Sequence, residues 1–147
     1  MITKSFVTAR YAETDQMGVI HHSVYAVWYE LARTDFIKKV GISYSKMEEM
    51  GILLPLSELT CKYHQATLYE DEITIETRIL ALTPSRIQFG YTVYKKGVEK
   101  PVNTGSTLHG WTDKALKPFN MKKRYPELYE TIFKCNGIRK GHCLFRQ

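Results

Sequence analysis

The residues best suited to chemistry in this sequence of 147 residues lie between Glu13 and Arg33, in the segment ETDQMGVIHHSVYAVWYELAR. Asp15 stands shortly before an amphipathic run that predicts a helix. The start of a helix gathers backbone N–H groups without partners and a partial positive charge, so a carboxylate near it stays ionised beside a group that can polarise a carbonyl. The pair of Asp15 and this helix start is therefore a candidate active site.

Each of these residues also has a plainer interpretation. An aspartate ahead of a helix is most often a cap or turn residue, and only the whole spacing Asp-x-x-Gly-x-x-x-His-x-x-Tyr, from Asp15 to Tyr25, favours a catalytic role. His21 and His22 are adjacent, so we expect their side chains to diverge, and no carboxylate stands at H-E-x-x-H spacing. The sequence therefore predicts no metal site.

One long helix should follow the candidate loop Glu13–His22. Between about residues 23 and 40, Trp28, Ala32, Phe36 and Val40 recur every four positions, and Gly41 supplies a stop. A strand is expected before the loop, in residues 4–12, and a short helix after it, in residues 43–51. These elements must position Asp15.

The second half of the chain changes to a period of two. Ile73, Ile75, Thr77 and Ile79 alternate with polar residues, and so do Ile87, Phe89, Tyr91 and Val93. Short turns at residues 69–72, 83–85 and 95–97 predict antiparallel neighbours, because a parallel crossover needs a dozen residues or more. A strand near residues 102–111 completes an expected meander, and a helix over 125–133 has Pro126 in its first turn.

These elements predict an α+β fold in which one long helix covers a face of an antiparallel sheet. The length and a hydrophobic content of 44% fit a single domain over residues 1–147, with a basic C-terminal helix and tail from about residue 121. Cys61, Cys135 and Cys143 form no C-x-x-C pair, which indicates reduced thiols, and no apolar leader or membrane span is apparent. We expect a cytoplasmic protein that does not insert into membranes.

The net charge of +6 comes from the end of the chain. Residues 1–113 carry 12 Lys and Arg against 13 Asp and Glu, whereas residues 114–147 carry 9 against 2. A basic tail is more often a solvated end than a polyanion-binding site. Without an arginine-rich block, zinc-finger spacing or RNA-binding motif, we expect no nucleic-acid partner.

The run from Asp15 through Gly18 and His22 to Tyr25, followed by Tyr29-Glu30-x-x-Arg33, resembles the 4-hydroxybenzoyl-CoA thioesterase and YbgC-like family of hotdog-fold acyl-CoA thioesterases. Tyr63 and the acidic pair Glu70-Asp71 match its second half. Ala66 departs from the family, in which many members have proline. The resemblance reaches to about Asp113.

This resemblance implies a hotdog fold, in a homodimer with active sites at the subunit interface, and often a homotetramer. Asp15 would be the catalytic carboxylate, as general base or nucleophile, and the N–H of His22 would polarise the carbonyl. Gly18, Tyr25 and Arg86 would bind substrate. Some relatives carry the carboxylate on the helix, where Glu30 stands, but an ion pair with Arg33 is the plainer role for Glu30.

The expected substrate is a small or medium acyl-CoA, or an acyl group on acyl carrier protein, and no separate cofactor is expected because CoA is part of the substrate. Lys62, Lys114 or the basic tail would hold the phosphates or the acidic carrier. Two alternatives remain open: a non-catalytic hotdog acyl-binding module, and a hotdog hydratase or dehydratase. His64 and His109 read as structural histidines in strands, and Trp28, Tyr29 and Phe36 as core and dimer interface.

Overall fold

The computed structural model describes residues 1–136. Its strands and helices are, in chain order, β1 (Thr3–Thr8), the 3-10 turn η1 (Tyr11–Glu13), α1 (Val24–Val40), α2 (Tyr44–Glu49), β2 (Leu56–Tyr63), β3 (Glu72–Leu82), β4 (Arg86–Lys95), β5 (Asn103–Gly110), α3 (Met121–Arg124) and α4 (Pro126–Lys134). Within this range, no helix has both the length and the apolar composition to cross a membrane.

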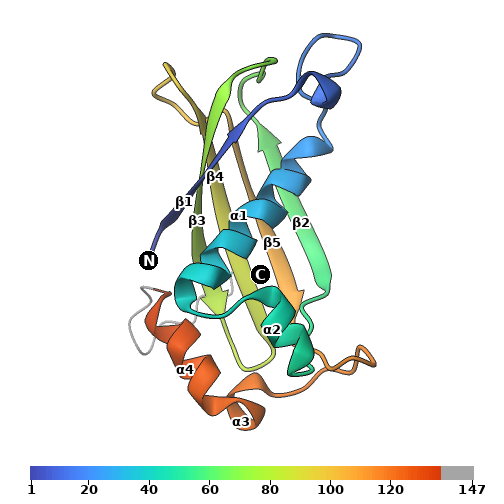
Figure 1. The fold of residues 1–147 in the computed structure, drawn as a ribbon, viewed down its shortest axis with the longest axis vertical. Coiled ribbons are helices and arrows are strands. Elements are labelled where there is room, and N and C mark those ends of the chain that lie inside the picture. The colour runs from blue at the N-terminus through green and yellow to red at the C-terminus, as the bar shows by residue number, and fades with distance from the viewer. Residues whose placement is uncertain (137–147) are drawn as a thin grey trace.

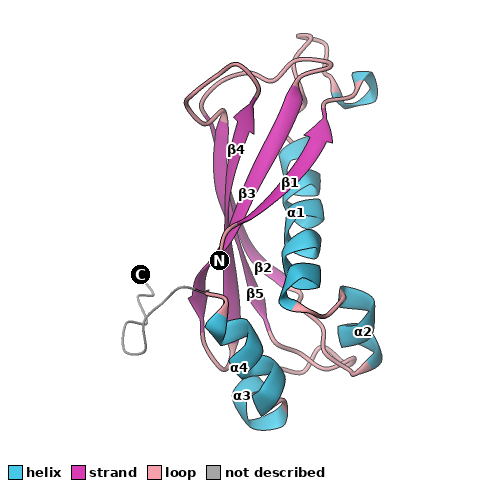
Figure 2. Cartoon of the chain, turned by 60° about the vertical axis from the view of Figure 1, so that its left-hand side comes forward, coloured by secondary structure: helices cyan, strands magenta, loops and turns pink. Residues whose placement is uncertain are grey.

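The five strands form one antiparallel sheet in the order β1-β3-β4-β5-β2. α1 runs along one face of the sheet, and the strands twist strongly around it (Figure 2). A single long helix held against one antiparallel sheet confirms the predicted α+β class and the hotdog arrangement.

The predicted meander is right for β3, β4 and β5 and wrong for β2. β2 pairs with β5 at the far edge of the sheet, where Leu59 lies opposite Thr107 and Cys61 opposite Gly105. Two strands, β5 and β4, therefore separate β2 from β3. The segment of residues 64–71 crosses between them, and its turn at Glu70 and Asp71 makes no hairpin.

The core lies between α1 and the sheet face that it covers. Ile73, Ile75 and Ile79 of β3 point into it and are at most 3% exposed. On the helix side Trp28, Tyr29 and Phe36 are equally buried, which confirms their predicted place in the core. These large side chains fix α1, and so the loop before it, on the sheet.

The long helix ends where the sequence predicts. Gly41 has a φ of 118°, and its N–H donates to the carbonyls of Ile37 and Lys38 at 3.3 and 3.1 Å. Glycine is favoured in this left-handed conformation because it has no Cβ to clash with the backbone. At the other end the helix begins at Val24, directly after the candidate loop.

The C-terminal helix α4 begins at Pro126, as predicted, and its Ile132 is fully buried. The amino group of Met1 donates to the carbonyl of Cys135 at 2.9 Å, which joins the two ends of the described chain. α3 and α4 lie at one end of the sheet and the loop before α1 at the other (Figure 1). The predicted basic tail beyond residue 136 lies outside the described residues.

Candidate active site

A buried carboxylate anchors the loop that precedes α1. Glu13 is 8% exposed, and its side chain accepts hydrogen bonds from the backbone N–H of Arg10 at 2.9 Å and from the indole N–H of Trp28 at 3.3 Å. The Arg10 guanidinium lies 3.3 Å from the same carboxylate. Because Trp28 belongs to α1, Glu13 fixes the loop to the helix that it precedes.

Asp15 closes the next turn with only one of its two carboxylate oxygens. Its Oδ1 accepts from the N–H of Met17 at 2.8 Å and from that of Val19 at 3.4 Å. Among residues 1–136, Oδ2 takes part in no hydrogen bond or ion pair. Asp15 is half-buried, so this oxygen is available for chemistry while the other holds the loop.

Gly18 shapes the turn rather than the cavity. Its φ is 80°, a left-handed conformation that side chains rarely adopt, and its N–H donates to the carbonyl of Asp15 at 3.0 Å. A Cβ at this position would meet no atom within 4 Å. The structure thus explains this glycine by its backbone conformation.

The loop is also hydrogen bonded to the crossing segment after β2. The N–H of Ile20 donates to the carbonyl of Thr67 at 2.8 Å, and Val19 forms an isolated bridge with Leu68. The hydroxyl of Tyr25 in α1 donates to Oγ1 of Thr67 at 3.1 Å. Loop, helix and crossing segment thereby meet around one fully buried threonine.

The backbone at the start of α1 presents a free donor. Among the described residues, the N–H of His22 has no hydrogen-bond acceptor, whereas the N–H of Ser23 is taken by Nδ1 of His21 at 3.2 Å. The hydroxyl of Tyr63 donates to the carbonyl of His22 at 2.9 Å. Tyr63 therefore orients the peptide group that follows His22.

Asp15, His22 and Tyr25 line one cavity of about 310 Å³. Its other lining residues are Met17, Val19, Ile20, Tyr63, His64, Gln65 and Ala66. Two of these lining residues each have a polar group without a partner in the described chain: Asp15 has one carboxylate oxygen and His22 has its backbone N–H. Together they can activate water or attack directly, and can stabilise the negative charge that develops on a carbonyl oxygen.

The tyrosines of the cavity remain protonated at neutral pH. Burial raises the pKa of Tyr25 above its usual value. Partial burial, together with the neighbouring Cys61 thiol, raises the pKa of Tyr63 to about 12. Their rings meet edge to face, with centroids 5.3 Å apart, so both serve as hydroxyl donors within a fixed aromatic wall.

The structure does not bring every candidate residue to this cavity. Arg86 lies at the start of β4, opposite Gly110, at the end of the sheet remote from Asp15. Gly18 is absent from the lining. Lys62 and Lys114 are exposed and also lie outside the lining.

The expected ion pair of Glu30 with Arg33 is wrong for the described chain, whose ion pairs do not include it. Glu30 is exposed on α1 and does not line the cavity. Arg33 instead lies near Tyr44, Tyr91 and His109, because its positive charge acts to lower the pKa of each of these three residues. The ion pair predicted for Glu30 from its spacing is therefore not formed among the described residues.

Histidine placement was predicted only in part. His109 is a structural histidine in β5: it is 1% exposed and bonded to the Leu54 carbonyl and the Thr107 hydroxyl. His64 instead follows β2, is exposed, and lines the cavity while bonded to Thr104. The ring centroids of His21 and His22 are 4.0 Å apart, with the ring planes tilted by 33°, so these side chains do not diverge.

Glu13, Tyr63 and His64 contribute to the site, yet their roles were not deduced from the sequence. The Glu13 carboxylate and the Tyr63 hydroxyl act through partners 15 and 41 positions away in the chain. No local spacing encodes such contacts. Within residues 1–136, the structure contains no group of three His, Cys, Asp or Glu residues arranged to hold a metal ion.

Comparisons with known proteins show the family to which the chain belongs. Residues 17–102 match the model of the thioesterase superfamily, 4HBT. A Bacillus subtilis protein named "Putative acyl-CoA thioesterase YneP" is 34% identical over 86% of this chain and 91% of its own length. An Arabidopsis thaliana acyl-acyl carrier protein thioesterase, ATL3, is 28% identical over 72% of this chain and 56% of its own.

Among solved structures, a DHNA-CoA thioesterase from Staphylococcus aureus superposes with a TM-score of 0.85. It is 34% identical and covers 90% of this chain and 89% of its own. The family model spans more than half of the chain, and the Bacillus relative is aligned over nearly all of it. The chain therefore belongs to the thioesterase superfamily and is a thioester hydrolase with the hotdog fold.

Proposed function

We propose that this enzyme hydrolyses the thioester bond of a small or medium acyl-CoA, or of the same acyl group on acyl carrier protein, and that Asp15 is its catalytic carboxylate. The observation that carries this proposal is the shared cavity. It is lined by Asp15 and His22, which have a carboxylate oxygen and a backbone N–H respectively without a partner among the described residues. A volume of about 310 Å³ suits an acyl group of this size.

The chemistry follows from these two groups. As general base, the free oxygen of Asp15 takes a proton from water while the water oxygen attacks the thioester carbonyl. The N–H of His22 stabilises the resulting oxyanion, a contribution worth on the order of 3 kcal/mol for one such donor. The C–S bond then breaks, and the thiolate takes up a proton. As nucleophile, Asp15 would instead form an acyl-carboxylate anhydride that water cleaves.

We propose that Tyr25 binds the acyl group of the substrate. The roles first expected for Gly18 and Arg86 are weaker, because neither residue lines the cavity. Relatives include both acyl-CoA and acyl carrier protein thioesterases by name, so both carriers belong to the proposal. CoA enters as part of the substrate, and no further cofactor is proposed.

The assembly and the compartment are also proposals. The family resemblance supports a homodimer with its active sites at the subunit interface, and a homotetramer of two such dimers. Cys61 and Cys135 are free thiols, which supports the expectation of a reducing cytoplasm.

The activity is tested by hydrolysis of a panel of short, medium, long and aromatic acyl-CoAs, each compared with the same acyl group on acyl carrier protein. We expect turnover with the smaller acyl groups and release of free thiol. Tight binding of acyl-CoA without any thiol release would favour the acyl-binding module. Addition of water to an enoyl-CoA would favour the hydratase.

The role of Asp15 is tested by Asp15→Asn. The amide oxygen can still accept from Met17 and Val19, so the turn survives while the base is lost. We expect turnover to fall by at least about a hundredfold with the melting temperature preserved. Glu30→Gln is the matched control and should retain activity, because Glu30 lies outside the cavity. The reverse result would place the catalytic carboxylate on the helix.

A further inference from the structure

The loop of residues 112–118 repeats the hydrogen bonds of the loop that carries Asp15. Oδ1 of Asp113 accepts from the N–H groups two and four positions later, at 2.9 and 3.0 Å. The backbone N–H of Asp113 donates to the carbonyl four positions later, and its carbonyl accepts from the N–H three positions later, each at 2.9 Å. Asp15 makes the same four contacts within its own loop. The two loops therefore require the same backbone conformation.

The two loops differ at the position whose backbone is left-handed. This residue is Gly18 in the first loop, with a φ of 80°, and Leu116 in the second, with a φ of 61°. Glycine adopts such a conformation freely, whereas the Cβ of leucine makes it strained. Leu116 is also 62% exposed, so burial of its side chain does not offset the strain. A leucine at this position therefore indicates a role outside the packing of the chain.

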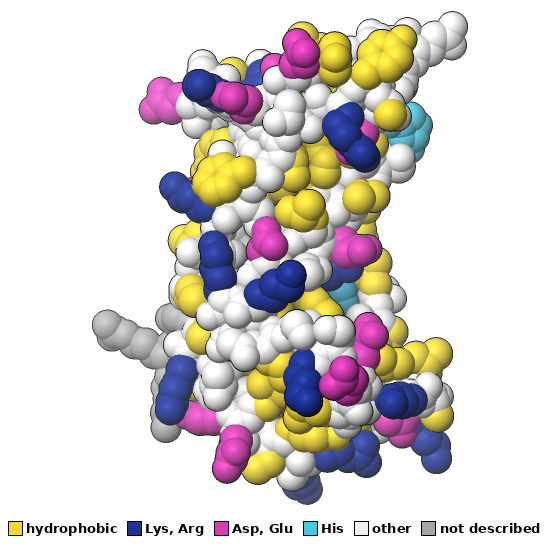
Figure 3. All heavy atoms as spheres, viewed as in Figure 1, with side chains coloured by type: hydrophobic (Ala, Val, Ile, Leu, Met, Phe, Trp, Pro, Cys, Tyr) yellow, Lys and Arg dark blue, Asp and Glu magenta, His cyan; other side chains and the backbone are white. Residues whose placement is uncertain are grey.

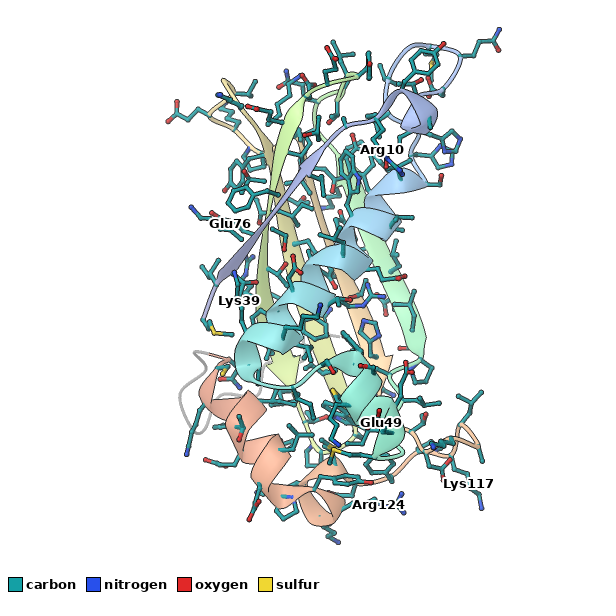
Figure 4. All side chains as sticks on the ribbon, in the orientation of Figure 1. Arg10, Lys39, Glu49, Glu76, Lys117 and Arg124 are labelled. Carbon is teal, nitrogen blue, oxygen red and sulfur yellow. The ribbon has the colours of Figure 1, made fainter. Side chains whose placement is uncertain are left out.

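The surface around Leu116 is basic. Residues 114–124 contain no Asp or Glu and five exposed basic residues: Lys114, Lys117, Lys122, Lys123 and Arg124. The Arg124 guanidinium lies over the Phe119 ring, 4.5 Å from its centroid, which holds α3 against the chain that follows the loop. Lys117 on the loop and Arg124 on α3 lie at the same end of the molecule (Figure 4). We call Leu116 and these five basic residues the basic patch.

Two acidic residues beside the basic patch are engaged in other contacts. The Asp113 carboxylate holds the loop through its Oδ1 atom. Glu49 of α2 lies at the same end of the molecule, and its carboxylate is 3.5 Å from the ammonium group of Lys46 (Figure 4). The basic patch therefore keeps a positive charge around one exposed apolar side chain.

We propose that the basic patch docks the protein onto an anionic lipid surface. Lipid phosphate groups attract the lysines and the arginine, each of which strengthens binding near such a surface by about fivefold. Leu116 enters the boundary between the headgroups and the acyl chains, where its exposed side chain leaves water. This docking is peripheral, because one side chain enters the surface and no helix spans it.

The shape of the loop favours a lipid surface over a protein partner. The loop that carries Lys117 projects from the body of the chain (Figure 4). A lipid surface accepts a projecting apolar side chain at any point, whereas a protein partner needs a pocket shaped to receive it. The lysines on both sides of Leu116 in the chain then meet phosphate groups as the leucine enters.

Co-sedimentation of the full chain with lipid vesicles tests the docking. One set of vesicles contains phosphatidylglycerol and phosphatidylcholine in equal parts, and the other contains phosphatidylcholine alone. At low salt we expect the protein to bind the anionic vesicles and not the neutral ones, and high salt should release it because the charges are then screened. Equal binding to both sets, or binding to neither, would overturn the proposal.

Leu116→Gly separates docking from folding. The substitution removes the apolar side chain and places glycine where the backbone is left-handed, so the melting temperature should hold or rise. Binding to the anionic vesicles should fall by about tenfold, since the buried apolar surface is lost. A lower melting temperature would show that Leu116 serves the fold, and unchanged vesicle binding would show that it does not touch lipid. Either result overturns the proposal.

The charges of the basic patch are tested by a matched pair of double variants. Lys117→Gln with Lys123→Gln removes two charges from the basic patch and should weaken binding to anionic vesicles by about tenfold or more. Lys96→Gln with Lys100→Gln removes two charges from the turn between β4 and β5, which lies outside the basic patch, and should weaken binding much less. Equal losses would mean that net charge alone, and not the basic patch, governs binding.

An acidic protein is the alternative occupant of the basic patch. Titration with acyl carrier protein that bears no acyl group distinguishes it from lipid. Binding of this carrier protein that Leu116→Gly abolishes, without any binding to vesicles, would assign the basic patch to an acidic protein and overturn the lipid proposal. None of these measurements depends on thioester hydrolysis, so the proposed activity stands or fails separately.

Discussion

Glu13 and Asp15 are carboxylates two positions apart with different surroundings. The Glu13 side chain is buried against Arg10 and Trp28 and uses both oxygens to hold the loop on α1. Asp15 lines the cavity, uses one oxygen for its turn and leaves the other without a partner in the described chain. The structural carboxylate and the proposed catalytic one thus differ in their contacts, although both precede the same helix.

Tyr63 should act by positioning the peptide group that follows His22, at the start of α1 and next to the proposed N–H donor. Tyr63→Phe removes the hydroxyl that donates to the His22 carbonyl but keeps the ring against Tyr25. The loss of one such hydrogen bond should lower kcat by about 2- to 10-fold and change KM little. Steady-state kinetics with a single acyl-CoA measures this split.

The control for this substitution is Tyr69→Phe, which removes an exposed hydroxyl in the neighbouring turn. It should leave kcat unchanged. Since the pKa of Tyr63 is about 12, the natural enzyme should also lose no activity up to about pH 10 through ionisation of this hydroxyl. An unaltered kcat in Tyr63→Phe would show that the bond does not position the site.

Asp15, His22 and Tyr25 could be predicted from the sequence because they share one short segment whose spacing is itself informative. Glu13 and His64 could not. Glu13 lies in the same segment, but its burial depends on Trp28 in the helix. His64 reaches the cavity only because the crossing segment folds back beside the loop.

Some helices and strands could likewise be predicted from the sequence, and others could not. Helix α1 and strands β3 and β4 follow from periodicity, because each has one buried face and one face that is less buried. β2 shows no such alternation, since it is exposed on both faces of the single chain. Its pairing with β5 could not be read from turn lengths, which suggested a neighbour in β3. A strand that is exposed on both faces lacks the alternation that identifies strands in the core.

His109 in β5 makes stability depend on pH. Burial lowers its pKa to about 4, from 6.5 in the unfolded chain, and the charge of Arg33 acts in the same direction. As pH falls from 6.5 towards 4, the unfolded chain binds a proton that the folded chain does not. The free energy of unfolding should therefore fall by about 3 kcal/mol from this residue, with no contribution above pH 6.5.

Urea unfolding at pH 7, 6 and 5 measures this dependence. In His109→Gln the amide retains hydrogen-bonding capacity without the titration, so its free energy of unfolding should change less over this range than that of the natural protein. The difference between the two proteins in how the free energy of unfolding changes with pH gives the contribution of His109, because the carboxylates are the same in both. Equal changes in the two proteins would contradict the lowered pKa of His109.

On the scale of the whole molecule, several basic residues lie at the end opposite the cavity. Figure 3 shows Lys and Arg side chains spread over this face, with several at the end opposite the loop of Asp15, and Figure 4 places Lys117 and Arg124 at that end. Arg86 lies at that end as well. Sequence alone could not show this separation, because the end of the sheet at which a turn lies depends on the topology.

The basic tail offers the last test. Ending the chain after Asn136 removes Arg139, Lys140 and Arg146 but keeps Ile132 in the core and the bond from Met1 to Cys135. If these charges attract an anionic carrier, KM should rise several-fold at low salt while kcat holds, and the difference should disappear at high salt, where charges are screened.

Both carriers must be compared, because an acidic carrier protein presents more charges than CoA and should show the larger rise in KM. The melting temperature of the shortened chain is the control for folding, and it should stay within a few degrees of the natural value, since no residue of the described core is removed. A cut after Phe133 would be less informative, because it also deletes the carbonyl that binds Met1. An unchanged KM for both carriers at low salt would identify the tail as a solvated end and leave phosphate recognition to the lysines before it.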